Sequence, residues 1–70
     1  MRLYIQLDNT GFLRSFATTS LEECVSSAKY ALTRDAYVDA ESITIYRLDT
    51  TTRALVKVRR VHRGDHVIEL

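Results

Sequence analysis

Hydrophobic and polar residues alternate along the first ten residues of the chain. In RLYIQLD, residues 2–8, the aliphatic residues Leu3, Ile5 and Leu7 fall on one side and the others on the opposite side. Strict alternation with a period of two is typical of a half-buried β-strand. We therefore expect a strand over 2–8 whose three aliphatic side chains face the core.

The next segment predicts a turn and a second strand. Asp8-Asn9-Thr10-Gly11 contains Asn and Gly, which both accept positive φ, so a hairpin into FLRSFAT, residues 12–18, is expected. Phe12 and Phe16 share a face with Arg14 in an extended chain. The pattern therefore leaves open which face of this second strand is buried.

The stretch TTSLEECVSSAKYALT changes to helical spacing. Ser20 is expected to cap the helix, with Glu23 three residues later completing a capping box at the positive end of the helix dipole. The apolar residues that share one helical face are Leu21, Cys24, Val25, Ala28, Ala31 and Leu32. We predict a helix over about residues 20–33, because cap and periodicity agree.

Strand patterns return in the second half of the chain. Residues 34–41 are expected to cross back to the sheet, anchored by Tyr37 or Val38. SITIYRL, residues 42–48, is predicted as a strand, DTTTR as a turn, and ALVKVRRV, residues 54–61, as its hairpin partner. After Gly64-Asp65, HVIEL either adds a short edge strand or trails along the domain.

The element order β-β-α-β-β predicts one small α+β domain spanning residues 1–70. We expect two layers, an antiparallel sheet of about four strands and a single helix packed on one of its faces. An antiparallel sheet of this kind leaves its other face exposed. A functional surface is expected on that exposed face.

Composition narrows the possible chemistry. Hydrophobic residues make up 46% of the chain, enough for an ordinary core, and a single cysteine permits neither an intrachain disulfide nor a zinc site built from several cysteines. No apolar run approaches the ~18 residues of a membrane span, and no signal-peptide pattern is present. We therefore expect a cytoplasmic protein with no membrane partner.

Catalytic and metal-binding patterns are weak. Cys24 lies on the apolar face of the predicted helix, where a buried hydrophobic role is expected. The two glycines stand too far apart to form a phosphate-binding loop. His62 and His66 flank a predicted turn, and a metal site would need further ligands. We predict no enzymatic activity, no catalytic residues, no metal and no cofactor.

Charge is distributed unevenly along the chain. Six Lys and Arg residues and one acid lie within 47–63, a net charge of +5, whereas the remaining residues carry four cations and eight acids, a net charge of −4. Such separation steers binding partners. It concentrates positive charge on the predicted second hairpin.

The sequence RALVKVRRVHR, residues 53–63, divides this charge between two strand faces. If Ala54, Val56 and Val58 face the helix, the opposite set projects from the exposed face of the sheet. Tyr4 and Tyr46 are expected beside these cations if Ile43 and Ile45 point inward. We therefore predict a partner-binding surface of four cations and two tyrosines: Arg53, Lys57, Arg59, Arg63, Tyr4 and Tyr46.

Several roles for this surface remain open at the level of sequence. Exposed Lys and Arg can simply prevent edge-to-edge aggregation. Tyr and Arg are enriched at protein-binding hot spots, and spaced cations also bind phosphates. A further alternative is that acidic residues bind a basic partner by imitating phosphates. The five candidates are Glu22, Glu23, Asp35, Asp39 and Glu41.

The layout of FATTSLEECVSSAKYALT followed by SITIYRLDTTTRALVKV resembles small phage-encoded anti-CRISPR proteins, which are compact inhibitors built from a few antiparallel strands and one helix. The resemblance covers most of the chain and concerns layout and size. It implies a non-enzymatic inhibitor in the host cytoplasm that docks on a bacterial immune complex, such as a CRISPR effector, and blocks its nucleic-acid binding. The alternative is a small nucleic-acid-binding module that uses the same basic face on phosphates.

Overall fold

The computed structural model describes residues 2–11, 13–18, 20–34, 39–64 and 66–70. The predicted anchors of the crossing segment, Tyr37 and Val38, lie outside the described residues.

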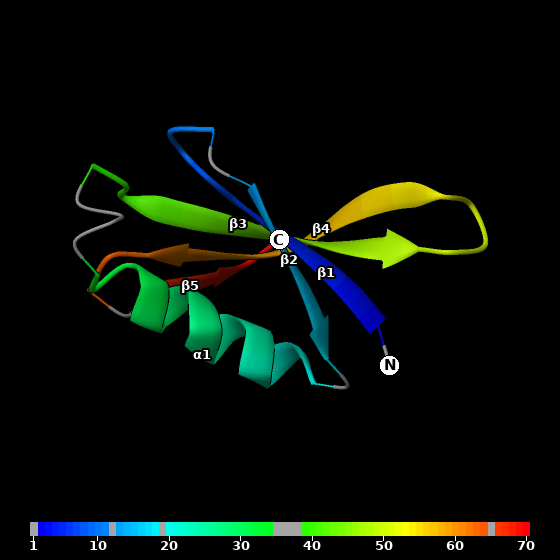
Figure 1. The fold of residues 1–70 in the computed structure, drawn as a ribbon, viewed down its shortest axis with the longest axis horizontal. Helices are drawn as coiled ribbons and strands as arrows, with labels where there is room; N and C mark the ends of the chain where they lie inside the picture. The colour runs from blue at the N-terminus through cyan, green and yellow to red at the C-terminus, as the bar shows by residue number, and fades with distance from the viewer. Residues whose placement is uncertain (1, 12, 19, 35–38, 65) are drawn as a thin grey trace.

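A five-stranded antiparallel sheet and one helix make up the described fold (Figure 1). The elements, in chain order, are β1 (Arg2–Asp8), β2 (Leu13–Thr18), α1 (Leu21–Ala31), β3 (Ser42–Asp49), β4 (Ala54–His62) and β5 (His66–Glu69). Their order across the sheet is β2-β1-β3-β4-β5. Helix α1 lies against one face, and the tip of the β3–β4 hairpin extends beyond it (Figure 1).

The predicted α+β class, the antiparallel sheet and the single helix are confirmed, whereas the expected four strands and the order ββαββ are not matched. The last residues form a fifth strand, β5, in which Val67 pairs with Val61 and His66 with His62. Gly64 permits the tight return because its φ is +90°, a conformation that other residues rarely adopt. The chain order is therefore ββαβββ.

Helix α1 begins where its cap was predicted. The Ser20 side chain accepts a hydrogen bond from the Glu23 backbone N–H at 3.4 Å. The Glu23 carboxylate accepts a 2.5 Å hydrogen bond from the Thr18 hydroxyl, and the Ser20 N–H donates to that same hydroxyl oxygen. The cap is thus shared with the end of β2, which ties the helix to the sheet. The helix ends at Ala31, with Leu32 as its C-cap, and so is shorter than predicted.

The core lies between α1 and the middle strands. Its largest fully buried side chains are Ile43 and Ile45 of β3, Val61 of β4 and Cys24 of α1. The helix contributes small residues, including Ala28 and Ala31, so its backbone packs close to the sheet. Ile43 and Ile45 point inward, which meets the condition on which Tyr46 was placed on the exposed face.

Strand β1 faces the opposite way from the prediction. Tyr4, Gln6 and Asp8 are buried on the helix side, at 4%, 2% and 7% exposure. Leu3 is 36% exposed, and by alternation it shares the other side of the sheet with Ile5 and Leu7. The expectation that these three aliphatic residues face the core is therefore wrong.

Hydrogen bonds from Gln6 explain this orientation. Its side-chain Nε2 donates to the Cys24 carbonyl at 3.1 Å and to the Cys24 Sγ at 3.3 Å, so the side chain bonds directly to α1. Its Oε1 accepts a 2.7 Å hydrogen bond from Arg14, which also donates to Ser27 Oγ at 2.9 Å. A buried amide whose donor and acceptor atoms are both bonded is a stable arrangement.

A β-bulge interrupts the alternation of β4. Ile45 pairs with Arg59 and Tyr46 with Lys57, so Val58 is an extra residue in the ladder. Val58 packs partly against the core, and from Arg59 onward the two faces of β4 exchange parity. Val61 consequently points inward, while Arg60 lies opposite Thr44 on the other face.

Candidate functional site

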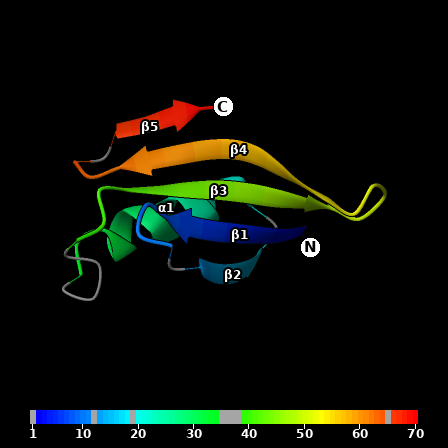
Figure 2. The same cartoon turned by 90° about the horizontal axis from the view of Figure 1, so that it is seen from above.

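The sheet face opposite α1 is the candidate site, and we call it the open face. In Figure 2 the five strands lie side by side with α1 behind them, and no described helix or strand crosses in front. Cross-strand partners share a face, so the register determines which side chains belong to it.

An apolar strip covers much of the open face. Its residues by register are Leu3, Ile5 and Leu7 of β1, Leu13 and Ala17 of β2, Tyr46 and Leu48 of β3, and Leu55 of β4. Ile68 of β5 lies on the same face but is separated from the strip by Arg60. Leu13 is 56% exposed and Leu55 is 52% exposed. Ile5 and Leu7 are half-buried, because Leu13, Ser15, Thr44 and Tyr46 flank them on neighbouring strands.

Cationic and imidazole side chains border the strip on β4 and β5. Lys57 lies opposite Tyr46, and Arg60 donates from Nε to Thr44 Oγ1 at 3.2 Å. His62 and His66 are cross-strand partners whose ring centroids lie 6.0 Å apart. The register places the acids of the described strands, Asp8, Asp49 and Glu69, on the helix side. Among described strand residues, the open face therefore carries cations and no carboxylate.

Two of the six predicted site residues lie together on the open face. Tyr46 and Lys57 are direct cross-strand partners, and Tyr46 also pairs with Ile5 of β1. Tyr4, in contrast, is 4% exposed and belongs to the core. The predicted placement of Tyr4 on the exposed face is wrong because β1 presents its even-numbered residues to the helix.

The other three predicted cations point elsewhere. Arg53 lies in the exposed β3–β4 turn with φ of +57°. Arg59 lies on the helix side after the bulge, 3.6 Å from the Glu69 carboxylate, a contact worth less than about 1 kcal/mol between partly exposed groups. The prediction that Arg53, Lys57, Arg59 and Arg63 share one face is wrong, since the bulge and the turn separate them.

Arg63 has a structural role. Its guanidinium donates to the carbonyl of Ala40 from Nε and Nη2, and to the carbonyl of Leu32 from Nη1. Its backbone N–H donates to the Glu41 carbonyl at 2.9 Å. Arg63 thus ties the residue after β4 to the end of α1, 31 positions earlier, and to the segment that enters β3, 23 positions earlier.

Sequence reasoning missed most of the open face. The apolar row of β1 was assigned to the core, and unbroken alternation from Ala54, Val56 and Val58 would also turn Arg60 and His62 inward. One signal was available in β4, where Val58 and Val61 are three residues apart after Ala54, Val56 and Val58 had followed at intervals of two. An odd interval between core residues of one strand indicates a bulge.

The buried thiol and the histidines supply little further chemistry. Burial raises the pKa of the Cys24 thiol, and the Gln6 hydrogen bond and the nearby Arg14 charge oppose part of that rise. A thiol with a raised pKa is a poor nucleophile at neutral pH. Within the part of the chain that the structure describes, no three His, Cys, Asp or Glu residues are grouped so as to hold a metal ion. No helix among the described residues is long and apolar enough to cross a membrane.

No protein-family model, curated protein or solved structure matches this chain. The functional argument therefore depends on the geometry and chemistry of the open face.

Proposed function

We propose that this chain is a small non-enzymatic binding protein that docks through its open face on a protein partner. The observation that carries the proposal is the outward orientation of Leu3, Ile5 and Leu7, which extends the apolar strip across the strands. A sheet with one free face normally presents polar residues to water. Contiguous apolar surface on a small domain is typical of an interaction site.

The size of the open face fits a standard interface. The molecule measures 36 × 21 × 19 Å. A sheet face of these dimensions offers roughly 700 Å² in projection, close to the ~800 Å² that each partner contributes to a typical specific complex. One face therefore suffices without rearrangement of the fold.

The charges of the open face specify the partner further. Lys57 and Arg60 border the apolar strip, with no carboxylate beside them among the described strand residues. A complementary surface would present apolar side chains with Asp or Glu at its rim, since opposite potentials favour association. A second copy of this chain is a poorer match, because the described strand residues of this face would bring cations from both copies and a carboxylate from neither.

The alternative of nucleic-acid binding loses support because few of the predicted cations lie on the open face. Arg59 and Arg63, which were expected to contact phosphates, point to the helix side and hydrogen-bond within the chain. Two cations on the open face would give a log–log salt slope of only about −2 on duplex DNA. The apolar strip between β1 and β3 contributes nothing to phosphate binding.

The identity of the partner stays a prediction from the resemblance in layout. The predicted partner is a bacterial defence nucleoprotein complex whose nucleic-acid site is blocked when this chain docks. A basic, aromatic and apolar sheet face suits a non-catalytic inhibitor of that kind. Competition between this chain and nucleic acid for the captured complex would test the prediction directly.

Affinity capture with matched variants tests the docking proposal. The tagged chain would be incubated with nuclease-treated bacterial lysate, and captured proteins identified by mass spectrometry and re-tested as purified components. Lys57→Glu and Leu13→Lys change exposed open-face side chains, whereas Tyr30→Lys changes an α1 side chain that is 63% exposed. Circular dichroism would verify that all three variants remain folded.

We expect Lys57→Glu and Leu13→Lys each to weaken binding of the purified partner by at least about tenfold, as for residues central to an interface. Tyr30→Lys should leave the affinity unchanged. Equal affinity in all variants would remove the open face from the interface. Saturable binding of DNA or RNA by the isolated chain would favour the nucleic-acid alternative, and a concentration-dependent dimer would favour a second copy.

A further inference from the structure

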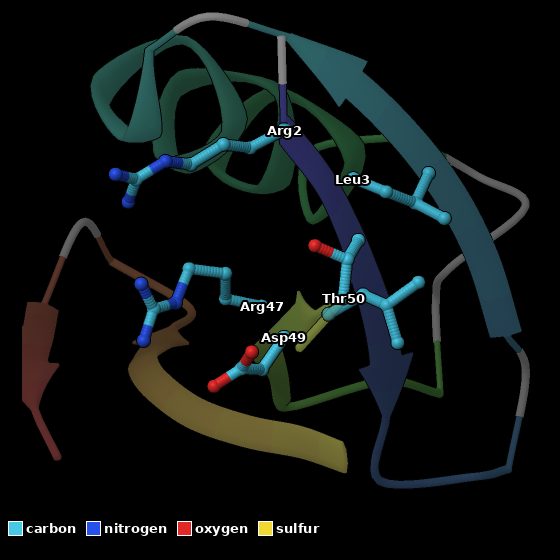
Figure 3. A pocket seen from close by; sticks show the side chains of 6 residues that line it. Arg2, Leu3, Arg47, Asp49 and Thr50 are labelled. Carbon is cyan, nitrogen blue, oxygen red and sulfur yellow. The ribbon is translucent and has the colours of Figure 1, made fainter. Parts of the chain in front are cut away.

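A pocket of about 460 Å³ lies between the start of β1 and the end of β3, apart from the centre of the open face. Its lining residues are Arg2, Leu3, Arg47, Leu48, Asp49 and Thr50. In Figure 3 the guanidinium groups of Arg2 and Arg47 extend to the same side of the two strands, with the Asp49 carboxylate below Arg47.

The Arg47 guanidinium lacks a partner that its environment demands. Its Nε is buried and has no hydrogen-bond partner among the described residues. A buried N–H without an acceptor costs about 1–3 kcal/mol, more for a charged group, so such an atom in a native fold calls for an explanation. Arg47 as a whole is only partly buried and lines the adjacent pocket, so a ligand oxygen there would compensate the guanidinium charge through its accessible part.

The second arginine adds positive charge to the same pocket. Within the described chain, neither Arg2 nor Arg47 lies in an ion pair with a carboxylate. Two guanidinium groups that line one pocket provide the planar, multiple donors that bind phosphate or carboxylate oxygens. The pocket is larger than a phosphate, so it also holds the group to which the oxyanion is attached, with Leu3 and Leu48 in its lining.

Asp49 is the one opposing charge in the lining. Its Oδ1 accepts hydrogen bonds from the backbone N–H groups of Thr51 at 2.9 Å and Thr52 at 3.4 Å, so the carboxylate is directed to the turn. The lining therefore carries two cations and one acid, a net charge of +1. Such a site is expected to bind anions weakly, and removal of the Asp49 charge should strengthen it.

We propose that the pocket formed by Arg2 and Arg47 is an oxyanion-binding site for a small ligand or ligand group that ends in phosphate or carboxylate. The site goes beyond docking at the open face and does not depend on it. The guanidinium groups of Arg47 and Arg2, which both line the pocket, donate to the ligand oxygens.

Titration with inorganic phosphate and with acetate, each at constant ionic strength against chloride, tests the site. The signals to follow are the arginine Nε–H resonances in ¹⁵N-labelled protein. We expect saturable shifts at Arg47 with a dissociation constant in the millimolar range. Saturation by acetate and not phosphate would support the site and assign it to carboxylate ligands; saturation by phosphate would assign it to phosphate.

Three variants separate this site from general electrostatics. Arg2→Gln should weaken binding by about fivefold, as expected for loss of one exposed ionic contact. Asp49→Asn keeps the Oδ1 acceptor for the turn and should strengthen binding several-fold. Arg53→Gln, in the exposed turn, should change nothing. The proposal would be overturned if neither anion gave saturable shifts, or if wild type and Arg2→Gln bound the anion equally. Lys57→Glu tests docking at the open face alone, so the two proposals can fail independently.

Discussion

Replacement of Gln6 by leucine tests the orientation of β1, on which the apolar strip depends. Gln6 is 2% exposed, bonds to Cys24 of α1 and accepts from Arg14 at 2.7 Å. Leucine has a similar volume but offers no polar atom. The partly buried guanidinium of Arg14 would lose one charge-assisted acceptor, although its hydrogen bond to Ser27 would remain.

The expected loss of stability follows from these contacts. A hydrogen bond to a charged group contributes about 1.5–3 kcal/mol, and the added apolar burial of leucine offsets part of its loss. We expect Gln6→Leu to lower the free energy of unfolding by about 2 kcal/mol. For a domain of this size that corresponds to a fall in melting temperature of roughly 8–16 °C.

The matched variant is Ile5→Gln, at the neighbouring position of the same strand. Ile5 is half-buried on the open face, so we expect this change to cost less than about 1 kcal/mol. Urea denaturation followed by far-UV circular dichroism would give both values, with unchanged m-values as the check on two-state unfolding.

The opposite orientation of β1 predicts the reverse result. If Leu3, Ile5 and Leu7 faced α1, Gln6→Leu would be close to neutral and Ile5→Gln would place an unpaired amide in the core at a cost of several kcal/mol. That outcome would refute the orientation of β1 and, with it, the apolar strip.

Three further predictions concern single residues. Arg63→Ala should lower the free energy of unfolding by about 2 kcal/mol, because carbonyls of Ala40 and Leu32 lose a charged donor; a urea-denaturation change below about 0.5 kcal/mol would contradict this role. Arg53→Gly should raise the free energy of unfolding by about 0.5–1 kcal/mol in the same assay, since Arg53 has φ of +57°; an unchanged or lower value would argue against strain at the turn. Burial raises the pKa of the Cys24 thiol in the folded chain. The resulting stabilisation is complete below the thiol's pKa in the unfolded chain and is lost as pH rises through its pKa in the folded chain. Wild type should therefore lose stability above about pH 9 relative to Cys24→Ala, and parallel curves of unfolding free energy against pH for the two proteins would refute this.

The helix and the first four strands were accessible from sequence because local signals determine them, whereas the fifth strand was left open. Ser20 and the spacing of apolar residues predicted α1 to within two residues at its C-terminal end, and alternation located β1, β3 and β4. The direction in which a strand faces is not local. Both rows of β1 can pack, and the choice depends on whether Gln6 finds partners on a helix 18 residues away.

The candidate site was predicted only in part, because alternation along β4 holds up to the bulge and fails after it. Tyr46 and Lys57 lie before the bulge, where the alternation of β4 still holds, and both are on the open face. Arg59 and Arg63 come after it, so the extrapolated pattern placed them on the wrong side. The pocket at Arg2 and Arg47 brings together residues 45 positions apart, which only the register of β1 with β3 determines.

The bulge at Val58 also has a consequence for how this protein can evolve. An in-frame deletion of that one codon would restore unbroken alternation along β4, with Lys57 still opposite Tyr46 and Arg59 still opposite Ile45. Every other side chain would keep its face, and only the partial packing of Val58 against the core would be lost. Deletion of a residue elsewhere in β4 would instead turn the side chains on one side of it to the opposite face. The bulge is therefore the position at which this strand can change its length without changing its recognition surface.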